Sequence, residues 1–472
     1  MADTAVSTNG VSPSQDTTIP RTLPNGRSRE QYYKPFPPNH FAPKPGDQKL
    51  DIAIIGAGIA GLLTAVALVQ SGHNVEVYER SKFANEIGAA INMCPNAARI
   101  LSYYEFNFDR AMPTTVEELN LADGHTFEIL HRADTPDMAA RFGAPWLLFH
   151  RVDLHNELKR LATEPRPSTA AVARIHLLAE VVDINLDGTL TLADGKKLTK
   201  DLIVVADGVK TRFATKVVGK DVSTRAIPTG TAVYRFLIPT EKLLKDEQTR
   251  YIYERGKSSM YIARHKDTRL VWYPCRGNLL QNYGFFHPDR IEGYDDEVWN
   301  IPASQEALMK SCSELHPDLL AICSKAEDLK LWRLCQREKP INKLTKGKVV
   351  LIGDAAHPML PHQGQGGGMA IEDGAALGVL LSHLHSKNEI LQRLALFERL
   401  RLDRVSAMQI FSSVGQDESA KIADLARPYV KGPLPTNADQ YHDYNFTPNI
   451  IRDAEELLAQ WRSTQASEKR DI

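Results

Sequence analysis

The 472-residue sequence predicts an α/β protein of two interleaved domains followed by C-terminal helices. A hydrophobic strand, a glycine turn and a helix fit residues 50–72, and a second strand, glycine loop and helix fit residues 348–384. Strand-rich segments lie between them, most clearly at 175–206 and 226–286. Because the two glycine loops lie far apart in the chain, we expect one domain to be built from both.

The expected domain boundaries follow these patterns. The first domain takes residues 49–220 and 340–400, a β-sheet domain takes 221–339, and residues 401–472 form helices and a polar tail. Residues 1–48 are rich in Pro, Ser, Thr, Asn and Gly, and such a segment buries too little apolar surface to offset its ordering entropy. A flexible N-terminal tail is therefore expected.

The composition is that of an ordinary globular protein, with 43% apolar and 24% charged residues. Lys and Arg total 57 against 58 Asp and Glu, so no broad electrostatic attraction to nucleic acid is expected. The N-terminus has no signal-peptide pattern, and no run of about 18 apolar residues predicts membrane insertion. The five cysteines are scattered without metal-site spacing, which favours reduced thiols in a cytoplasmic protein. A monomer or a homodimer is expected, and the sequence does not decide between them.

The first chemical motif is the glycine turn, with Gly56, Gly58 and Gly61 at GxGxxG spacing after a hydrophobic strand. Glu79 ends the next predicted strand, where a carboxylate can accept hydrogen bonds from a ribose. The glycines permit a tight turn and a close approach of a pyrophosphate to a helix N-terminus. This context predicts a Rossmann-type dinucleotide-binding domain.

The second motif is the loop between residues 353 and 368. Its strand ends in Asp354, a carboxylate able to bind a ribityl or ribose hydroxyl, and its glycines, including Gly367, open a helix. The positive end of that helix suits developing negative charge, such as that on a reduced flavin. A third segment, around Asp207 and Arg212, carries an Asp-Gly turn for which a purely structural role is as well supported.

These segments occur in the order typical of class A flavoprotein monooxygenases. The matching stretches are GAGIAGL with Glu79, EIGAAINMCPNAARIL, HRVDLHNEL, the DG segment and GDAAHPMLPHQGQGGGMAIEDGAAL. Over about residues 50–400 the chain resembles salicylate and p-hydroxybenzoate hydroxylases, and it looks most like fungal members that hydroxylate or dearomatise phenols in secondary metabolism. The resemblance implies a glutathione-reductase-like FAD domain and a β-sheet substrate domain. It also implies NADPH or NADH as transient reductant, and oxygen transfer from O2 through a C4a-hydroperoxyflavin.

The resemblance also assigns residues to roles. Those expected to bind FAD are Gly56, Gly58, Gly61, Glu79, Ala90, Asn92, Arg151, Asp207, Asp354 and Gly367, although the family usually has Gly where Ala90 stands. Arg235 and Tyr273 match residues that bind a phenolate in the dearomatising relatives. A buried guanidinium lowers the pKa of a nearby phenol by about 1–3, and the tyrosine can donate a second hydrogen bond. Tyr261 is a weaker pocket candidate.

Two alternatives stay open: an indole or alkene epoxidase of the same family, and a flavin-binding interaction protein without monooxygenase activity. No metal is expected, because His357 and His362 have no carboxylate or Cys at ligand spacing. The sequence does not identify the phenol, the position oxidised, or whether the reaction is hydroxylation, dearomatisation, decarboxylation or epoxidation.

Overall fold

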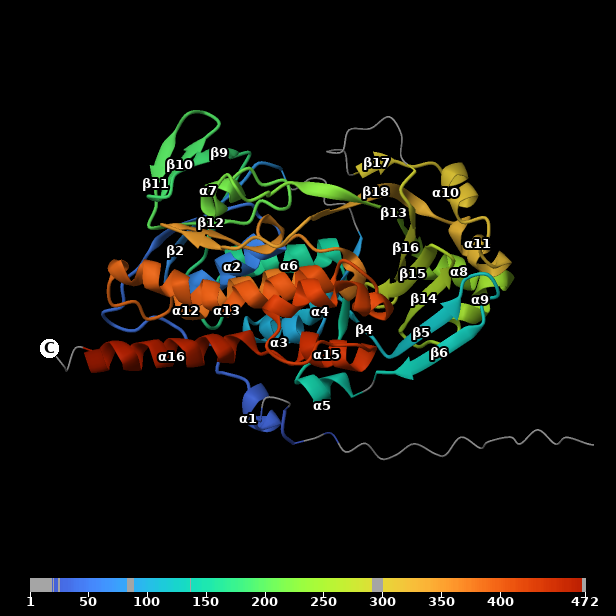
Figure 1. The fold of residues 1–472 in the computed structure, drawn as a ribbon, viewed down its shortest axis with the longest axis horizontal. Helices are drawn as coiled ribbons and strands as arrows, with labels where there is room; N and C mark the ends of the chain where they lie inside the picture. The colour runs from blue at the N-terminus through green and yellow to red at the C-terminus, as the bar shows by residue number, and fades with distance from the viewer. Residues whose placement is uncertain are drawn as a thin grey trace, which may run out of the picture.

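Two large sheets and the helices around them make up most of the described molecule (Figure 1). The computed structural model describes residues 19, 21–23, 26–82, 89–135, 137–290 and 300–468. Among these residues, none of the helices combines the length and the apolar character that crossing a bilayer requires.

The first sheet has six strands in the order β19-β20-β12-β1-β2-β8, and all neighbours except β19 and β20 run parallel. Its strands are β1 (Asp51–Ile55), β2 (Asn74–Glu79), β8 (Arg174–Leu177), β12 (Leu202–Val205), β19 (Thr345–Lys346) and β20 (Val349–Leu351). Helices α2 (Ile59–Gln70), α6 (Arg151–Thr163) and α12 (Gly366–Leu380) pack together beside it. The central strands are nearly continuous apolar runs, as expected for parallel strands covered on both faces. The expected Rossmann-type FAD-binding fold is present.

The second sheet has eight strands in the order β17-β18-β13-β16-β15-β14-β5-β6. They are β5 (Glu118–Asp123), β6 (Ile129–Asp134), β13 (Ala226–Pro239), β14 (Ser259–His265), β15 (Thr268–Cys275), β16 (Leu280–Pro288), β17 (Asn300–Pro302) and β18 (Glu327–Arg337). One face packs on α8 (Thr240–Leu244), α9 (Glu247–Tyr253), α10 (Gln305–Ser311) and α11 (Pro317–Cys323), which lie on the outer side in Figure 1. The other face is directed toward the first sheet and its helices.

The second sheet differs from the expected division at β5 and β6. Both strands precede residue 221, yet β5 pairs in parallel with β14, from Ser259↔Glu118 to Arg264↔Asp123. Alternating polarity identifies a strand but not the sheet that it joins, because pairing of this kind depends on contacts remote in the sequence.

Two small sheets complete the β structure, in the orders β3-β7-β4 and β11-β10-β9. Their strands are β3 (Ala90–Met93), β4 (Thr114–Thr115), β7 (Leu147–His150), β9 (Val181–Ile184), β10 (Thr189–Leu192) and β11 (Lys197–Thr199). The remaining helices before the C-terminal region are α1 (Arg29–Tyr33), α3 (Pro95–Tyr103), α4 (Phe108–Ala111), α5 (Met138–Phe142), α7 (Ala214–Val218), η1 (Gly353–Ala355), η2 (Pro361–Gln363) and η3 (Lys387–Glu389).

The C-terminal region is helical. Its elements are α13 (Ile390–Phe411), η4 (Gln416–Ile422), α14 (Ala423–Ala426), η5 (Arg427–Tyr429), α15 (Ala438–Phe446) and α16 (Ile450–Glu468). Helices α13 and α16 both pack against α12.

Part of the expected flexible tail is packed against this region. Tyr32 of α1 is buried, and its hydroxyl donates to Asp453 of α16 at 2.9 Å. Phe41 belongs to the main hydrophobic core. Buried aromatic side chains pack this segment against the rest of the chain, although its composition resembles that of a tail. Residues 26–48 are therefore ordered structure. Most of the expected tail before residue 26 lies outside the described residues.

Candidate active site

The turn between β1 and α2 is shaped by two glycines that tolerate no side chain. Gly56 has φ +98°, and a Cβ there would stand 2.5 Å from the carbonyl oxygen of Ala206. A Cβ on Gly61 would overlap the carbonyl oxygen of Gly56. Both clashes are with backbone, so these glycines allow α2 to start directly against β1 and β12.

Gly58 is different, because its surroundings are open. No heavy atom of the described chain lies within 4 Å of where its Cβ would stand, and Gly58 is the N-cap of α2 without a side-chain cap. Free N–H groups at a helix N-terminus next to open space suit a pyrophosphate. This turn therefore fits the phosphate groups of FAD.

Glu79 is held at the edge of the same turn. Its two oxygens accept hydrogen bonds from the N–H groups of Ala57, at 2.9 Å, and Ser81, at 2.8 Å. His155 of α6, which the sequence analysis did not select, lies buried with its Nε2 2.8 Å from the Ala57 carbonyl oxygen. The HRVDLHNEL stretch contains His155, but a histidine on the buried face of a helix gave no separate signal.

Asp207 follows β12 and is adjacent to the turn through Ala206. Burial raises the pKa of Asp207 to about 6, although Thr211, Arg80 and Arg212 act in the opposite direction. Its Oδ1 is buried and has no hydrogen-bond partner among the described residues. A buried acceptor without a donor fits a site that receives a hydroxyl or N–H group from a ligand.

The second glycine loop presents Asp354. Its side chain is exposed, yet burial by the surrounding protein raises the pKa of this carboxyl, against the effects of His357, Arg151 and Arg337. Asp354 is therefore recessed but open to solvent, as a cofactor ligand would be. A Cβ on Gly367 would stand 2.7 Å from Met93 Cε, so this glycine lets α12 approach β3.

Behind this loop lies a network of buried ions. Asp373 accepts from the Gly353 N–H at 2.9 Å and lies 2.6 Å from His357 Nε2. Arg401 of α13 pairs with both Asp373 and Glu372. The network thus joins the start of the loop to two helices.

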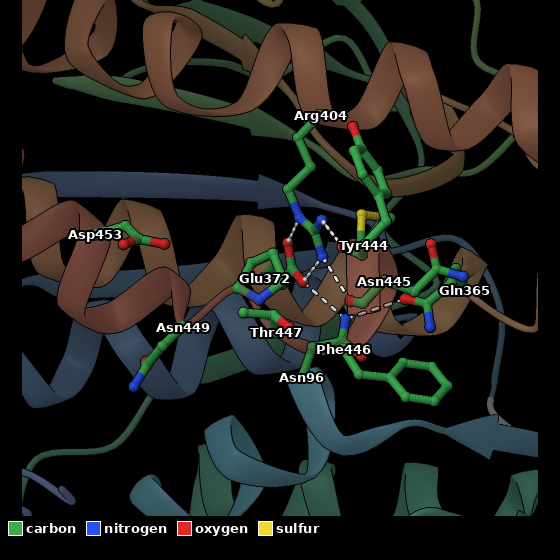
Figure 2. Close-up of polar contacts among 12 residues, drawn as sticks. Asn96, Gln365, Glu372, Arg404, Tyr444, Asn445, Phe446, Thr447, Asn449 and Asp453 are labelled. Atoms are coloured by element: carbon green, nitrogen blue, oxygen red, sulfur yellow. Dashed lines mark hydrogen bonds and ion pairs between the residues drawn. The ribbon is translucent and has the colours of Figure 1, made fainter. Parts of the chain in front are cut away.

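Figure 2 shows the far side of that network. Arg404 donates two hydrogen bonds to Glu372, at 2.8 and 2.7 Å, and a third to the carbonyl oxygen of Asn445. Asn96 donates to Glu372 and to Gln365, the N-cap residue of α12. Burial alone would raise the pKa of Glu372, but Arg404 and Arg401 lower it to about 2. The sequence pattern does not reveal this network, because its members are separated in the chain.

Strand β3 lies beside the second loop. Asn92 Oδ1 accepts a hydrogen bond from Trp146 Nε1 at 3.2 Å, and the Asn92 Cβ is 3.5 Å from the position of a Cβ on Gly364. The Ala90 carbonyl oxygen accepts from the Tyr273 hydroxyl at 3.3 Å. The expected cofactor residues Ala90 and Asn92 are thus next to an expected substrate residue.

Arg235 and Tyr273 lie on the same face of the second sheet. Arg235 is on β13 and Tyr273 on β15, with β16 between them. Burial lowers the pKa of Arg235, Tyr273 opposes this effect and Arg151 adds to it. Burial raises the pKa of Tyr273, and Arg235 opposes the rise. The structure therefore brings Arg235, Tyr273 and Arg151 within electrostatic reach of one another.

Tyr261 is on the other face. Its ring stacks on Trp272 at 4.5 Å between centroids, in the cluster that packs on α8–α11. The pocket role considered for Tyr261 is therefore wrong. The alternation that places Tyr273 toward the first domain places Trp272 and its partner away from it.

Comparison with known proteins identifies the family. A family model described as FAD binding domain matches residues 154–412, and another, FAD dependent oxidoreductase, matches residues 51–106. The chain is 34% identical over 383 residues to an FAD-dependent monooxygenase of Diaporthe leptostromiformis, covering 81% of this chain and 96% of the relative. It is 32% identical over 380 residues to hispidin-3-hydroxylase of Neonothopanus nambi, covering 76% and 86%.

Solved structures agree. A salicylate hydroxylase substrate complex matches with a TM-score of 0.63 at 25% identity, covering 89% of this chain and 94% of that chain. CtdE in complex with FAD and a substrate matches with a TM-score of 0.69 at 21% identity, covering 89% and 100%, which shows the shared fold.

The chain belongs to the FAD-dependent monooxygenases. It is a flavoprotein oxidoreductase, and FAD is its cofactor. The expected family, enzyme class and fold are thereby confirmed, while the roles of the individual site residues stay predictions.

Proposed function

We propose that this monooxygenase hydroxylates a phenolic aromatic compound, with NADPH or NADH as the reductant and O2 as the oxygen source. Relatives of the chain include proteins named hispidin-3-hydroxylase and 6-hydroxynicotinate 3-monooxygenase, the latter 28% identical over 380 residues and from Pseudomonas fluorescens. These names support an aromatic substrate that carries a hydroxyl group.

One observation carries the proposal: a partly buried cation on the inner face of the second sheet. Arg235 is only partly buried by surface area, yet burial lowers its pKa, so it is recessed while still reachable. Its guanidinium carbon lies 5.8 Å from the Trp332 ring centroid, which gives it an aromatic neighbour. Opposite Arg235 on β16 is Gly284. A Cβ on Gly284 would stand 3.3 Å from Phe286 Cε2 and 3.5 Å from Val233 Cγ2, so the glycine leaves room for these side chains.

The residues of this chain then have separate tasks. FAD, when bound, supplies the oxygen-transfer chemistry. Arg235 favours the phenolate over the phenol, because a guanidinium in a partly desolvated place stabilises a neighbouring anion. Tyr273 orients the same oxygen as a hydrogen-bond donor. A phenolate ring is more electron-rich than a phenol ring, so it reacts more readily with an electrophilic oxygen.

The test is the Arg235→Gln variant. It should keep FAD bound, while product formation falls by about 10²–10⁴-fold, the scale of losing a group that controls protonation. Raising the pH should partly restore the rate, since solvent then supplies the phenolate. Arg132→Gln is the control, because Arg132 is on β6 and pairs with Glu118 away from the site.

The measurement is single-turnover product formation against pH with a panel of phenols. A wild-type rate for Arg235→Gln across the whole range would refute phenolate activation by this residue. The epoxidase alternative, which needs no phenolate, would then be favoured.

A further inference from the structure

Ala90 is bound through both of its backbone polar groups by two side chains of the second sheet. The Ala90 N–H donates to Asn282 Oδ1 at 3.0 Å, and the Ala90 carbonyl oxygen accepts from the Tyr273 hydroxyl at 3.3 Å. Asn282 and Tyr273 are directly opposed neighbours on β16 and β15. One cross-strand pair of side chains therefore binds both backbone polar groups of one residue in another sheet.

These two hydrogen bonds provide partners for backbone groups at the edge of a sheet. Strand β3 is the terminal strand of its sheet, and its ladder partner β7 pairs Ala90 with His150. An edge strand presents N–H and C=O groups that need partners when they are buried. Here side chains, not a further strand, provide them, and they tie β3 to the sheet that carries Arg235.

The two hydrogen bonds differ in quality. A distance of 3.0 Å is ordinary for N–H···O, whereas 3.3 Å is long for O–H···O, which prefers about 2.5–3.0 Å. Asn282 is 7% exposed, so its oxygen has little access to water as a substitute partner. The Asn282 bond is thus the firm one, and the Tyr273 bond is the one more easily exchanged.

We propose that Asn282 is a positioning residue that keeps β3 fixed while the Tyr273 hydroxyl turns from the Ala90 carbonyl to the substrate oxygen. The inference rests on the proposed function in one respect, the substrate role of Tyr273. Without Asn282, both backbone polar groups of Ala90 lack a partner once the Tyr273 hydroxyl turns to the substrate. The start of β3 then has neither of these hydrogen bonds to the second sheet.

A second anchor further along β3 limits the effect to its first residues. Asn92 is held by Trp146, whose ring packs on Phe446 of α15 at 5.3 Å between centroids. This contact does not involve the second sheet. Loss of Asn282 should therefore loosen the region around Ala90 without unfolding β3.

The first experiment is amide hydrogen exchange on the apoprotein of the full chain. Asn282→Leu removes the acceptor of the Ala90 N–H with a side chain of similar size. The Ala90 amide should then exchange about tenfold faster or more, because no hydrogen bond has to open before exchange. Asn282→Asp retains an acceptor oxygen and should keep most of the protection. Should Asn282→Leu not fold, Asn282→Ala provides the same comparison.

The matched control is Gln281→Leu. Gln281 is the preceding buried amide, but it faces the other way and donates to Thr240 Oγ1 at 3.1 Å. Its loss should lower overall stability without a selective effect on Ala90. Equal Ala90 exchange in Asn282→Leu and the wild type, or equal acceleration in both Leu variants, would overturn the proposal.

Tyr273→Phe removes the Tyr273 hydrogen bond to Ala90 and leaves the Asn282 hydrogen bond in place. It should leave Ala90 exchange within about twofold of the wild type, because the weaker bond is the one removed. In the holoenzyme it should lower product formed per NAD(P)H oxidised, measured with the panel of phenols. A large gain in Ala90 exchange for Tyr273→Phe would refute the assignment of Asn282 as the firm anchor. An unchanged product yield alone would count against the proposed function and not against the exchange result.

Discussion

The two strand–turn–helix units of the FAD domain look alike in sequence but are held by different forces. The turn from β1 to α2 depends on glycines, because a Cβ on Gly56 or Gly61 would meet backbone carbonyl groups. The loop from β20 to α12 depends on buried charge, because Asp373 holds the Gly353 N–H and His357. One turn is determined by excluded volume, the other by an ion network.

The difference shows how far each unit depends on the rest of the chain. A Cβ on Gly61 would meet the nearby Gly56, whereas a Cβ on Gly56 would meet Ala206, which is remote in the sequence. The spacing of the two glycines nevertheless lies within six residues, so it is visible as a short motif. Asp373 is neutralised by Arg401, and Glu372 by Arg401 and Arg404, all of them on α12 and α13. The second loop is therefore sensitive to substitutions on a helix that does not border it in sequence.

The largest effect is expected when the ion network is broken. Arg401→Met leaves two fully buried carboxylates short of a partner, and such a loss costs about 3–5 kcal/mol in the free energy of unfolding. Urea denaturation of the apoprotein measures it. Arg399→Met is the control, because Arg399 is exposed on the same helix and should change stability by less than about 0.5 kcal/mol. Equal effects would mean that the network does not stabilise the fold.

Asp354→Ala separates cofactor binding from this network. It should weaken FAD binding by about 1.5–3 kcal/mol, or roughly ten- to over a hundredfold. The free energy of unfolding of the apoprotein should not fall, because burial already disfavours the charged form of Asp354. Titration of the apoprotein with FAD, beside urea denaturation, gives both numbers. Unchanged FAD affinity would remove Asp354 from the site.

The glycine turn is tested by a pair of substitutions with opposite expectations. Gly61→Ala should destabilise the apoprotein by about 1–3 kcal/mol, the usual cost of overpacking. Gly58→Ala should leave apoprotein stability nearly unchanged, because its Cβ meets open space, while FAD binding weakens. Thermal unfolding with and without FAD measures both. Full FAD binding by Gly58→Ala, and by the larger Gly58→Val, would show that the pyrophosphate lies elsewhere.

A pH slope distinguishes the buried histidine His73 from the ion network. Burial lowers the pKa of His73 to about 4, below its unfolded value of 6.5, so its contribution is complete above pH 6.5 and is lost as the pH falls toward 4. Stability should then fall by about 1.4 kcal/mol per pH unit from this group. The contribution of Glu372 is complete above pH 4.5 and is lost as the pH falls from 4.5 toward 2.

The measurement is urea denaturation at intervals between pH 7 and 4. His73→Gln should reduce the slope in this window, and Glu372→Gln should reduce stability without removing the slope. A slope that disappears with Glu372→Gln instead would show that the ion network, and not the histidine, titrates here.

Sequence alone determined the features that depend on local sterics and on periodicity. The GxGxxG spacing predicted the turn before α2, and Glu79 was placed beside it as expected. Helices α2 and α12 and the strands β1 and β20 that precede them followed from apolar runs flanked by glycines. Such signals are readable because each is a spacing of residues that are close in the chain.

Tertiary structure decided everything that depends on which distant surfaces meet. It joined β5 to β14, seated Phe41 in the core and turned Tyr261 away from the site. It also brought Asn282 to Ala90. Period-two alternation says that neighbouring strand residues face opposite ways, but which face becomes the inner one is settled only by packing of sheets and helices from remote parts of the chain.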